Sequence, residues 1–418
     1  MKIKMRKLPY EKVMALPRPK HKNPLKPHFL FRVLIRVLSA PALISLRFTS
    51  RKEGLEAVGK QPCLILMNHS SFTDLKIVSK LFFPRPFCIV STTDSYVGKN
   101  WLMRFIGCIP TKKFISDLML IRDMSYALHT LKTSVLMFPE AGYSLDGRAT
   151  ILPKRLGAVI KRLKAPVIMV TTYGAFARDP LYNGLRIRKV KASADVKCLF
   201  TAQEVCDKSM DDIDREIEKA FSFDQFAWQR DQRVRIQESF RADGLERVLF
   251  KCAACGCEGK MIGKGIHLAC TDCGKTYELD EYGQLRALDG KTEFPHIPDW
   301  FDWQRMEVEK QIENGEYRLE TDVDIGMLVD HKALYMVGSG KLKHDVNGFV
   351  LEGCEGKLHY EQSPIQSYSL NVDYYWYEIG DVICIGNNDA LYYCFVKGNT
   401  SVTRARLAAE ALYRMKKQ

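Results

Sequence analysis

The chain has 418 residues, of which 46% are hydrophobic and 27% charged, a composition that excludes a disordered or low-complexity polypeptide. Its 63 Lys and Arg against 49 Asp and Glu give a formal net charge of +14, and this excess lies in the first two thirds, because residues 274–418 carry a net charge of −8. The strong positive charge of residues 1–273 predicts an anionic partner, either nucleic acid or a phospholipid surface.

A basic lead-in opens the chain. Residues 1–28 contain nine Lys and Arg against the single acidic Glu11, and Pro and Lys crowd residues 17–27, which predicts a flexible or extended segment. The first apolar stretch begins only near Phe29, behind this segment, so we expect no signal peptide. Thirteen cysteines in a chain of this length then indicate a reduced, cytosolic environment rather than a disulfide framework.

Residues 29–48 (FLFRVLIRVLSAPALISLRF) are about long enough to span a bilayer but contain arginines and Pro41. Arg32 and Arg36 share one helical face, and apolar side chains occupy most of the rest. We predict that residues 1–50 comprise the lead-in and a helix that lies in the membrane interface, on the cytoplasmic face of an anionic membrane. The alternative is an ordinary helix that packs on the domain and ends at Pro41.

Residues 51–248 alternate short apolar runs with longer helical patterns, as over residues 117–133 and 209–245. This alternation predicts an α/β domain with helices flanking a sheet. Four buried strands are predicted, at residues 63–67, 87–90, 135–138 and 166–170.

The run NHSSFTD at residues 68–74 directly follows the first of these strands. Ser71 and Asp74 have the spacing of a helix start, which places His69 in the preceding loop and Asp74 in the first helical turn. The carboxylate of Asp74 could then accept a hydrogen bond from one imidazole nitrogen, leaving the other to take a proton from an alcohol. The alternative is that Asp74 only caps the helix and His69 is a structural loop residue, and the motif alone favours that alternative.

A second block, FPEAGYS at residues 138–144, favours a catalytic role for His69 and Asp74 over the structural one. It leads into the turn LDGR at residues 145–148. The two blocks resemble the glycerophospholipid acyltransferase family typified by 1-acylglycerol-3-phosphate acyltransferases. That family has Asn-His-x4-Asp followed further along by Phe-Pro-Glu-Gly-Thr-Arg-Ser. The run GCIPTKK at residues 107–113 resembles the intervening block, and the strand at residues 166–170 resembles the fourth.

The resemblance implies an O-acyltransferase. It implies transfer of a fatty acyl group from acyl-CoA or acyl carrier protein to the free hydroxyl of a lysophospholipid, first of all 1-acylglycerol-3-phosphate, without a covalent acyl-enzyme. His69 is then the general base, and Asp74 orients it. The residues that we expect at the acceptor are Asn68, Lys112, Lys113, Glu140, Gly142, Tyr143 and Arg148.

Among the departures from the family pattern, three bear on how the acceptor phosphate is held. Tyr143 replaces the arginine of the third block, and Lys112 and Lys113 replace the Asp-Arg pair of the second. Lysine holds a phosphate as a point charge but lacks the bidentate fork of arginine. A substitute clamp is expected from these lysines with Arg148, Lys154 and Arg155, unless they are only a solvated basic surface. The alternative function is a catalytically weakened scaffold that binds lipid or nucleic acid.

Residues 249–290 contain two CxxC pairs, each followed by glycine. Four thiolates at this spacing predict a tetrahedral, structural zinc site in a zinc ribbon. Ribbons often bind nucleic acid or protein, which keeps nucleic-acid binding by the basic half as a rival, although no nucleic-acid motif supports it. Cys257 is predicted to lie outside the site. The predicted ligands are Cys252, Cys255, Cys270 and Cys273.

Residues 291–418 show short Tyr- and Val-rich runs separated by turn residues, then a helical pattern at residues 400–417. We predict a β-rich domain that ends in a helix, similar in outline to pleckstrin-homology or GRAM-like domains. Its net negative charge disfavours inositide binding. Docking on the catalytic domain or on a protein partner, such as an acyl carrier, is the expected role.

Overall fold

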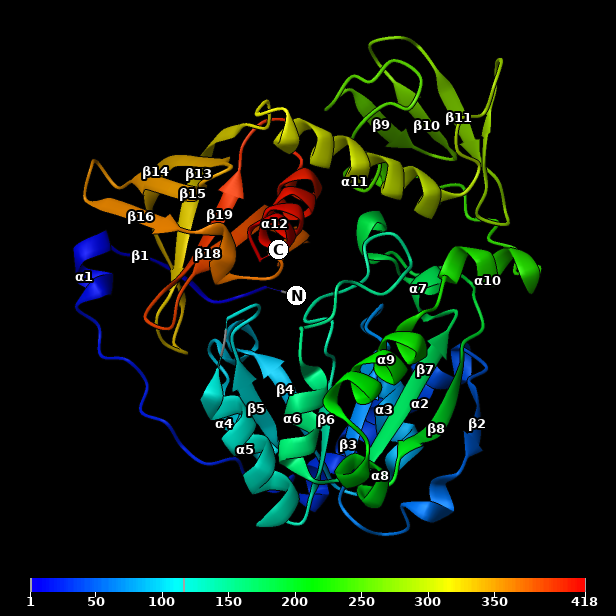
Figure 1. Cartoon of the computed structure of the whole chain (residues 1–418), viewed down its shortest axis with the longest axis vertical. Helices are drawn as coiled ribbons and strands as arrows, with labels where there is room; N and C mark the ends of the chain where they lie inside the picture. The colour runs from blue at the N-terminus through cyan, green and yellow to red at the C-terminus, as the bar shows by residue number, and fades with distance from the viewer. Residues whose placement is uncertain (1, 116, 418) are drawn as a thin grey trace.

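A seven-stranded mixed sheet organises the first half of the molecule (Figure 1). The computed structural model describes residues 2–115 and 117–417. The strand order is β2-β8-β7-β3-β6-β4-β5; β8 runs antiparallel to β7, and the other neighbours are parallel. The strands are β2 (Thr49–Glu53), β3 (Leu64–Met67), β4 (Phe87–Thr92), β5 (Cys108–Thr111), β6 (Ser134–Met137), β7 (Val167–Tyr173) and β8 (Ser193–Phe200).

Helices cover both faces of this sheet, and the alternation of side chains along β3 shows why. Leu64 and Leu66 face one apolar core, and Ile65 and Met67 face the other. The structure confirms the predicted α/β sheet flanked by helices. One face is covered by α2 (Phe29–Ser45) and α3 (Asp74–Phe82), and the other by α5 (Leu118–His129), α6 (Leu156–Leu163) and α9 (Met210–Phe221). Shorter helices are α4 (Asn100–Phe105), α7 (Ala175–Arg178), α8 (Ala202–Asp207) and α10 (Gln225–Asp231).

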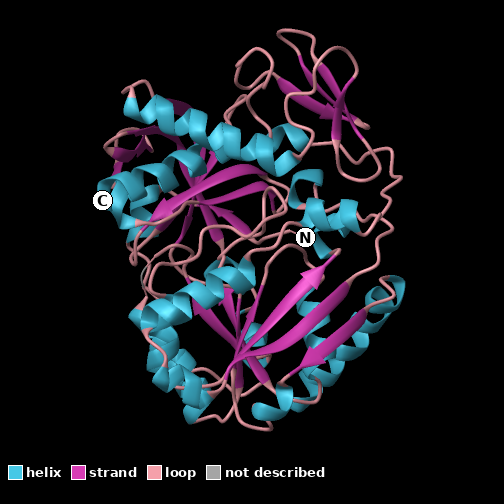
Figure 2. Cartoon of the chain, turned by 45° about the vertical axis from the view of Figure 1, so that its right-hand side comes forward, coloured by secondary structure: helices cyan, strands magenta, loops and turns pink. Residues whose placement is uncertain are grey.

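The five strands β3 to β7 run parallel, so their carboxyl ends meet at one edge of the sheet. Ligands of open α/β sheets bind at this edge. In Figure 2 the strands fan upward toward a second, β-rich region, which lies over them. The loops that follow β3, β4, β5 and β6 therefore lie between the two regions.

The prediction of one helix over residues 209–245 is only partly right. The segment contains α9 and α10, and residues 232–244 form no helix. Asp224 explains the first break, because its side chain accepts a hydrogen bond from the backbone N–H of Ala227 and begins a new helix.

Helix α2 continues through Pro41 to Ser45, so the expectation that Pro41 ends a helix is wrong. Leu43 packs in the sheet core, whereas Leu34, Val37 and Leu38 are exposed. Among the described residues, no helix combines the length and apolarity needed to cross a membrane.

The cysteine region forms a separate four-stranded antiparallel sheet with the order β12-β11-β10-β9. The long helix α11 (Ile297–Glu313) then leads to the β-rich region, and Trp300 of this helix packs against Tyr277 of β11. The four strands are β9 (Met261–Lys264), β10 (His267–Cys270), β11 (Thr276–Leu279) and β12 (Leu285–Ala287).

The β-rich region confirms the prediction of a β-rich part ending in a helix. Its strands pair antiparallel in the order β16-β15-β14-β13-β19-β18-β17, and α12 (Val402–Lys417) packs on them and on α11. The sequence analysis did not predict α11. The strands are β13 (Leu319–Leu328), β14 (Leu334–Asp345), β15 (Gly348–Gly353), β16 (Leu358–Gln362), β17 (Asn371–Trp376), β18 (Gly380–Gly386) and β19 (Leu391–Val396).

The basic lead-in ties the two halves of the molecule together, and its residues 17–27 form no helix or strand, as an extended segment would. β1 (Met5–Lys7) pairs in parallel with β14, and α1 (Tyr10–Met14) packs nearby. The chain then crosses to the first sheet, where His21 Nε2 lies 3.0 Å from both carboxylate oxygens of Asp123. Figure 1 shows this blue segment running from the β-rich region to α2.

Candidate active site and metal centre

His69 and Asp74 form a hydrogen-bonded pair at the carboxyl edge of the sheet. His69 Nδ1 lies 2.9 Å from Asp74 Oδ2, and this oxygen also accepts the backbone N–H groups of Ser70 and Ser71 at 2.9 and 3.1 Å. An ionised carboxylate only accepts hydrogen bonds, so Nδ1 carries the proton and Nε2 keeps its lone pair. No described residue binds Nε2, and 22% of the His69 side chain is exposed. This nitrogen is free to take a proton.

The local fold explains this geometry. Helix α3 begins at Asp74, with Thr73 at its cap, and the Ser71 hydroxyl accepts the Thr73 N–H at 2.9 Å. The predicted helix start is therefore present, although Asp74 binds the loop before the helix rather than capping it.

Two aromatic rings hold the imidazole in place. The Phe138 ring stacks on the His69 ring with centroids 4.1 Å apart, and the Tyr143 ring lies 4.2 Å away. Phe138 and Tyr143 come from the loop after β6, so that loop and the loop after β3 form one site. Tyr143, at the position of the arginine in the family pattern, thus contacts the His69 ring itself. Burial and the charge of Asp74 raise the pKa of the Tyr143 phenol well above its ordinary value.

The Glu140 side chain joins the loop after β3 to the loop after β6. Its Oε1 accepts the His69 backbone N–H at 2.9 Å, and its Oε2 accepts the Thr150 backbone N–H at 3.0 Å. Burial of the carboxyl group raises the Glu140 pKa to about 8. Glu140 is therefore a buried support for the His69 backbone.

Asn68 also supports the site from behind. Its Oδ1 accepts the Thr172 backbone N–H at 2.8 Å, which joins the end of β3 to β7. Gly142 faces open space, because a Cβ placed there would meet no atom within 4 Å. Among the described residues, neither Gly142 nor Tyr143 has a hydrogen-bond partner for its backbone N–H.

The candidate phosphate clamp is dispersed. Arg148 makes two 2.7 Å hydrogen bonds to Asp302 of α11 and another at 2.8 Å to Asp146, and the paired carboxylates raise the pKa of its guanidinium. Lys112 donates to the Asn388 carbonyl in the β-rich region. Lys113 alone has no ion-pair or hydrogen-bond partner among the described residues.

Lys154 and Arg155 lie away from this group. The Lys154 ammonium lies 5.7 Å from the ring of Tyr413 in α12, and Arg155 occupies the N-cap position of α6 without a side-chain hydrogen bond. Both side chains are exposed, whereas Lys113 is half-buried and lines a cavity of about 220 Å³.

Sequence reasoning missed two buried acids near the site. Asp179 accepts a 2.5 Å hydrogen bond from the Ser71 hydroxyl, and burial raises its pKa to about 7. Asp373 of β17 is close enough to raise the pKa of Tyr143. No motif marks either residue, because each reaches the site only through the tertiary fold.

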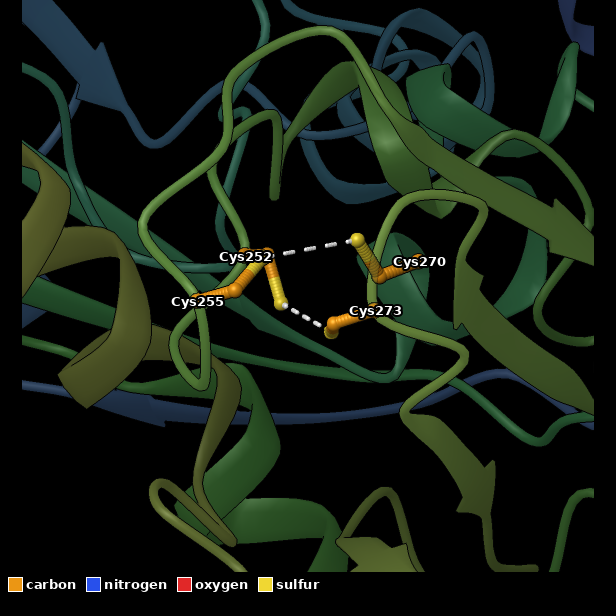
Figure 3. A group of neighbouring side chains, drawn as sticks. All are labelled: Cys252, Cys255, Cys270 and Cys273. Carbon is orange, nitrogen blue, oxygen red and sulfur yellow. Dashed lines mark hydrogen bonds between the residues drawn. The ribbon is translucent and has the colours of Figure 1, made fainter.

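The four cysteines predicted to bind zinc come together. Cys252 Sγ lies 3.8 Å from Cys273 Sγ, and Cys255 Sγ lies 3.7 Å from Cys270 Sγ. All four sulfurs lie within 4.8 Å of one another and point toward a common centre (Figure 3). Four sulfurs bound at about 2.3 Å in a tetrahedron are about 3.8 Å apart, so the cluster fits a zinc ion. Cys257 instead donates to Asp272 at 3.0 Å.

Part of the chain is similar to known proteins. Residues 49–173 match the family model described as Acyltransferase. The chloroplastic 1-acyl-sn-glycerol-3-phosphate acyltransferase BAT2 of Brassica napus is 27% identical over 128 residues, which cover 29% of this chain and 36% of that relative. The chain thus spans little more than a third of that relative. The crystal structure of PlsC, the 1-acyl-sn-glycerophosphate (LPA) acyltransferase of Thermotoga maritima, is 16% identical with a TM-score of 0.36 and covers 46% of this chain and 76% of that chain.

Proposed function

We propose, from the match of residues 49–173 to the Acyltransferase family model, that the protein acylates the free hydroxyl of a lysophospholipid. The donor is a thioester, acyl-CoA or acyl-ACP, and 1-acylglycerol-3-phosphate is the reference acceptor. The observation that carries the proposal is the His69–Asp74 pair, whose free Nε2 lies at the edge where ligands of such sheets bind.

The proposed chemistry needs only these side chains. Nε2 of His69 takes the proton of the acceptor hydroxyl as its oxygen attacks the thioester carbonyl carbon. Asp74 stabilises the imidazolium that forms. When the tetrahedral intermediate collapses, the C–S bond breaks, and the imidazolium returns the proton to the departing thiolate. The free amides of Gly142 and Tyr143 are suited to bind the oxyanion.

We also propose that the protein works at an anionic membrane surface, on its cytoplasmic face. Exposed apolar side chains of α2 and α4 lie side by side and line an open groove of about 420 Å³. In the sequence, Lys26 lies two residues before the lining residue His28, and Arg104 of α4 directly precedes Phe105, so cations that favour anionic lipid lie next to the lining residues along the chain. The groove is lined by His28, Leu30, Phe31, Leu34, Trp101 and Phe105.

We propose a structural zinc ion at the four cysteines. Zinc bound to four thiolates has no open coordination position for a substrate, so its contribution would be to the folding of the small sheet. The acyl-transfer chemistry would not involve it.

A second candidate function is a weakened lipid-binding scaffold. The observation in its favour is the Tyr143 ring, which covers the catalytic imidazole where the family has an arginine. Nucleic acid remains the disfavoured ligand, because the sequence carries no recognisable nucleic-acid-binding motif.

Acyl transfer to a panel of lysophospholipids, measured with both acyl-CoA and acyl-ACP, separates these functions. His69→Ala is expected to lower kcat by on the order of 10²–10⁴, the usual contribution of a positioned base. Asp74→Asn should also lower it severely. His129→Ala is the matched control, because its ring binds the Leu163 carbonyl between helices. Full activity in a folded His69→Ala protein would overturn the mechanism, and inactivity of the unaltered protein with every donor and acceptor would favour the scaffold.

A further inference from the structure

A cavity of about 220 Å³ lies between the acyltransferase domain and the β-rich region. The loops that follow β4 and β5 form one wall, and the ends of β17, β18 and β19 form the other. The two walls are joined: the Ser367 hydroxyl donates to the Phe114 carbonyl at 3.0 Å, and the rings of Phe114 and Tyr368 lie 5.4 Å apart. The cavity exists only because the β-rich region packs on the catalytic domain.

The cavity is lined by polar groups without partners. Lys113 has no ion pair or hydrogen bond to a described residue, and the same holds for the side chains of Thr93, Asn371 and Tyr393, which also line it. None of these four polar groups is fully buried, so all four are available to bind a ligand that enters the cavity.

The lining of the cavity also includes a negatively charged side chain, opposite in charge to Lys113. Asp94 lines the cavity, and its Oδ2 accepts a 3.4 Å hydrogen bond from the Tyr377 hydroxyl. Asp373 lies close by: its burial raises its pKa to about 7, whereas the nearby Lys113 lowers it. The ammonium group of Lys113 therefore lies close to the carboxyl groups of Asp94 and Asp373.

The cavity and His69 lie along one line of strand ends. The strands run in the order β3-β6-β4-β5, so the end of β3 with His69 and the end of β5 with Lys113 are three strand spacings apart, about 14 Å. Tyr143 lies between the two places. Its ring contacts the His69 ring, and the charge of Asp373 helps to raise the pKa of its hydroxyl. The cavity therefore lies along the same edge of the sheet as His69, with Tyr143 between them.

Resting on the proposed function, we infer that this cavity binds the headgroup of the acceptor and selects a zwitterionic phosphodiester. The phosphate lies beside Lys113, and the ammonium group of the headgroup lies beside Asp94. A bare phosphomonoester, with up to two negative charges, would meet one cation and two carboxyl groups. A neutral polyol would leave Asp94 without a counter-charge.

The test compares two phosphodiester acceptors, lysophosphatidylethanolamine and lysophosphatidylglycerol, with lysophosphatidate as a third. The unaltered protein is expected to show a kcat/KM at least tenfold higher for the ethanolamine lipid than for the glycerol lipid. Asp94→Asn should lower that ratio about tenfold and should raise kcat/KM for lysophosphatidate. The asparagine keeps an oxygen for Tyr377, so the variant should fold, which its melting temperature checks.

Two further variants define the site. Lys113→Met should lower kcat/KM for all three acceptors, because each carries a phosphate. Asp389→Asn is the matched control: it removes an exposed negative charge on the loop beside the cavity and should leave the ratio within twofold.

Calorimetry with glycerophosphoethanolamine, the headgroup alone, makes the test independent of acyl transfer. Binding to the full chain that weakens about tenfold in Asp94→Asn would support the cavity even if no lysolipid is acylated, an outcome that would defeat only the proposed function. Acylation with equal kcat/KM for the two phosphodiesters, unchanged in Asp94→Asn, would overturn this inference and leave the proposed function standing.

Discussion

At the scale of single residues, the site contains two acids with opposite tasks. Asp74 accepts three hydrogen bonds on one oxygen, one from the His69 ring and two from backbone amides. Glu140, by contrast, is enclosed, and burial raises its pKa despite two backbone hydrogen bonds. The partner of the His69 ring is therefore Asp74, and Glu140 fixes the backbone that carries His69.

Glu140 should make the stability of the protein depend on pH. Its pKa is raised from 4.5 to about 8, so between these values the folded chain holds a proton that the unfolded chain releases. The free energy of unfolding must then fall as pH rises through this window. Glu140→Gln cannot titrate, and the fall should be smaller in this variant.

Urea denaturation of both proteins at several values between about pH 5 and pH 8 measures the difference. Asp179 and Asp373 titrate in the same direction in both proteins, so their contributions cancel in the comparison. Glu56→Gln, at an exposed position, is the control and should follow the unaltered protein. Parallel curves for Glu140→Gln and the unaltered protein would contradict the assignment.

At the scale of elements, the small sheet of β9 to β12 depends on its cysteines. Few residues between Cys252 and Cys273 are both apolar and buried, chiefly Met261 and Leu268. Tyr277, Leu279 and Leu285 anchor β11 and β12 in the larger core, so metal binding is expected to stabilise chiefly the turns that carry the cysteines.

Elemental analysis under reducing conditions should find one zinc ion per chain. Cys270→Ser should lose it, because one of four thiolates is removed, whereas Cys257→Ser should retain it, since Cys257 binds Asp272 outside the cluster. Acyl transfer should survive in Cys270→Ser, because no cysteine of the cluster contacts His69. A well-folded chain without bound metal would rule out the zinc site.

The apolar face of α2 makes a second prediction about an element. Leu34 and Leu38 are 48% and 68% exposed, and burying one leucine in lipid contributes roughly 1.5–3 kcal/mol. The double variant Leu34→Asp, Leu38→Asp should therefore weaken binding to anionic vesicles by at least about tenfold.

Vesicle sedimentation measures this effect, and Leu288→Asp, which alters a leucine 59% exposed in the cysteine region, controls for added charge. Substitution is a sharper test than deletion of residues 1–48, because that deletion would also remove β1 from the β-rich sheet. Equal sedimentation of the double variant and the control would refute the proposed membrane face.

At the scale of the whole molecule, a few side chains fasten the acyltransferase domain to the regions that follow it. Arg148 joins Asp146 of the catalytic loop to Asp302 of α11, and it also donates to the Pro298 carbonyl at 3.2 Å. The residue that the sequence analysis assigned to phosphate is thus engaged in holding the domains together.

Arg148→Met should lower the free energy of unfolding by roughly 2 kcal/mol, because it leaves the buried Asp146 without its cation. Denaturant titration measures the loss. Arg162→Met, on α6, is the control and should change stability little, since the described residues give it no ion pair. A large rise in the KM for the acceptor, with little change in the free energy of unfolding, would instead favour a phosphate-binding role for Arg148.

The sequence by itself determined the local features: the alternation of strands and helices, the His69–Asp74 pair and the set of four cysteines. Each depends on residues a few positions apart or on hydrophobic periodicity, which are written directly in the chain. The short spacing of each CxxC pair and the loop after β3 could be predicted for that reason.

Only the tertiary structure decided what surrounds the candidate site. Asp94 and Lys113 meet Asp373 across a domain interface, and Tyr143 reaches the His69 ring from another strand. The lead-in pairs with β14 more than three hundred residues away. Such contacts depend on how whole elements pack, and neither periodicity nor motif spacing encodes them. The sequence therefore indicates the chemistry at His69, while the packing of the β-rich region shapes the pocket beside it.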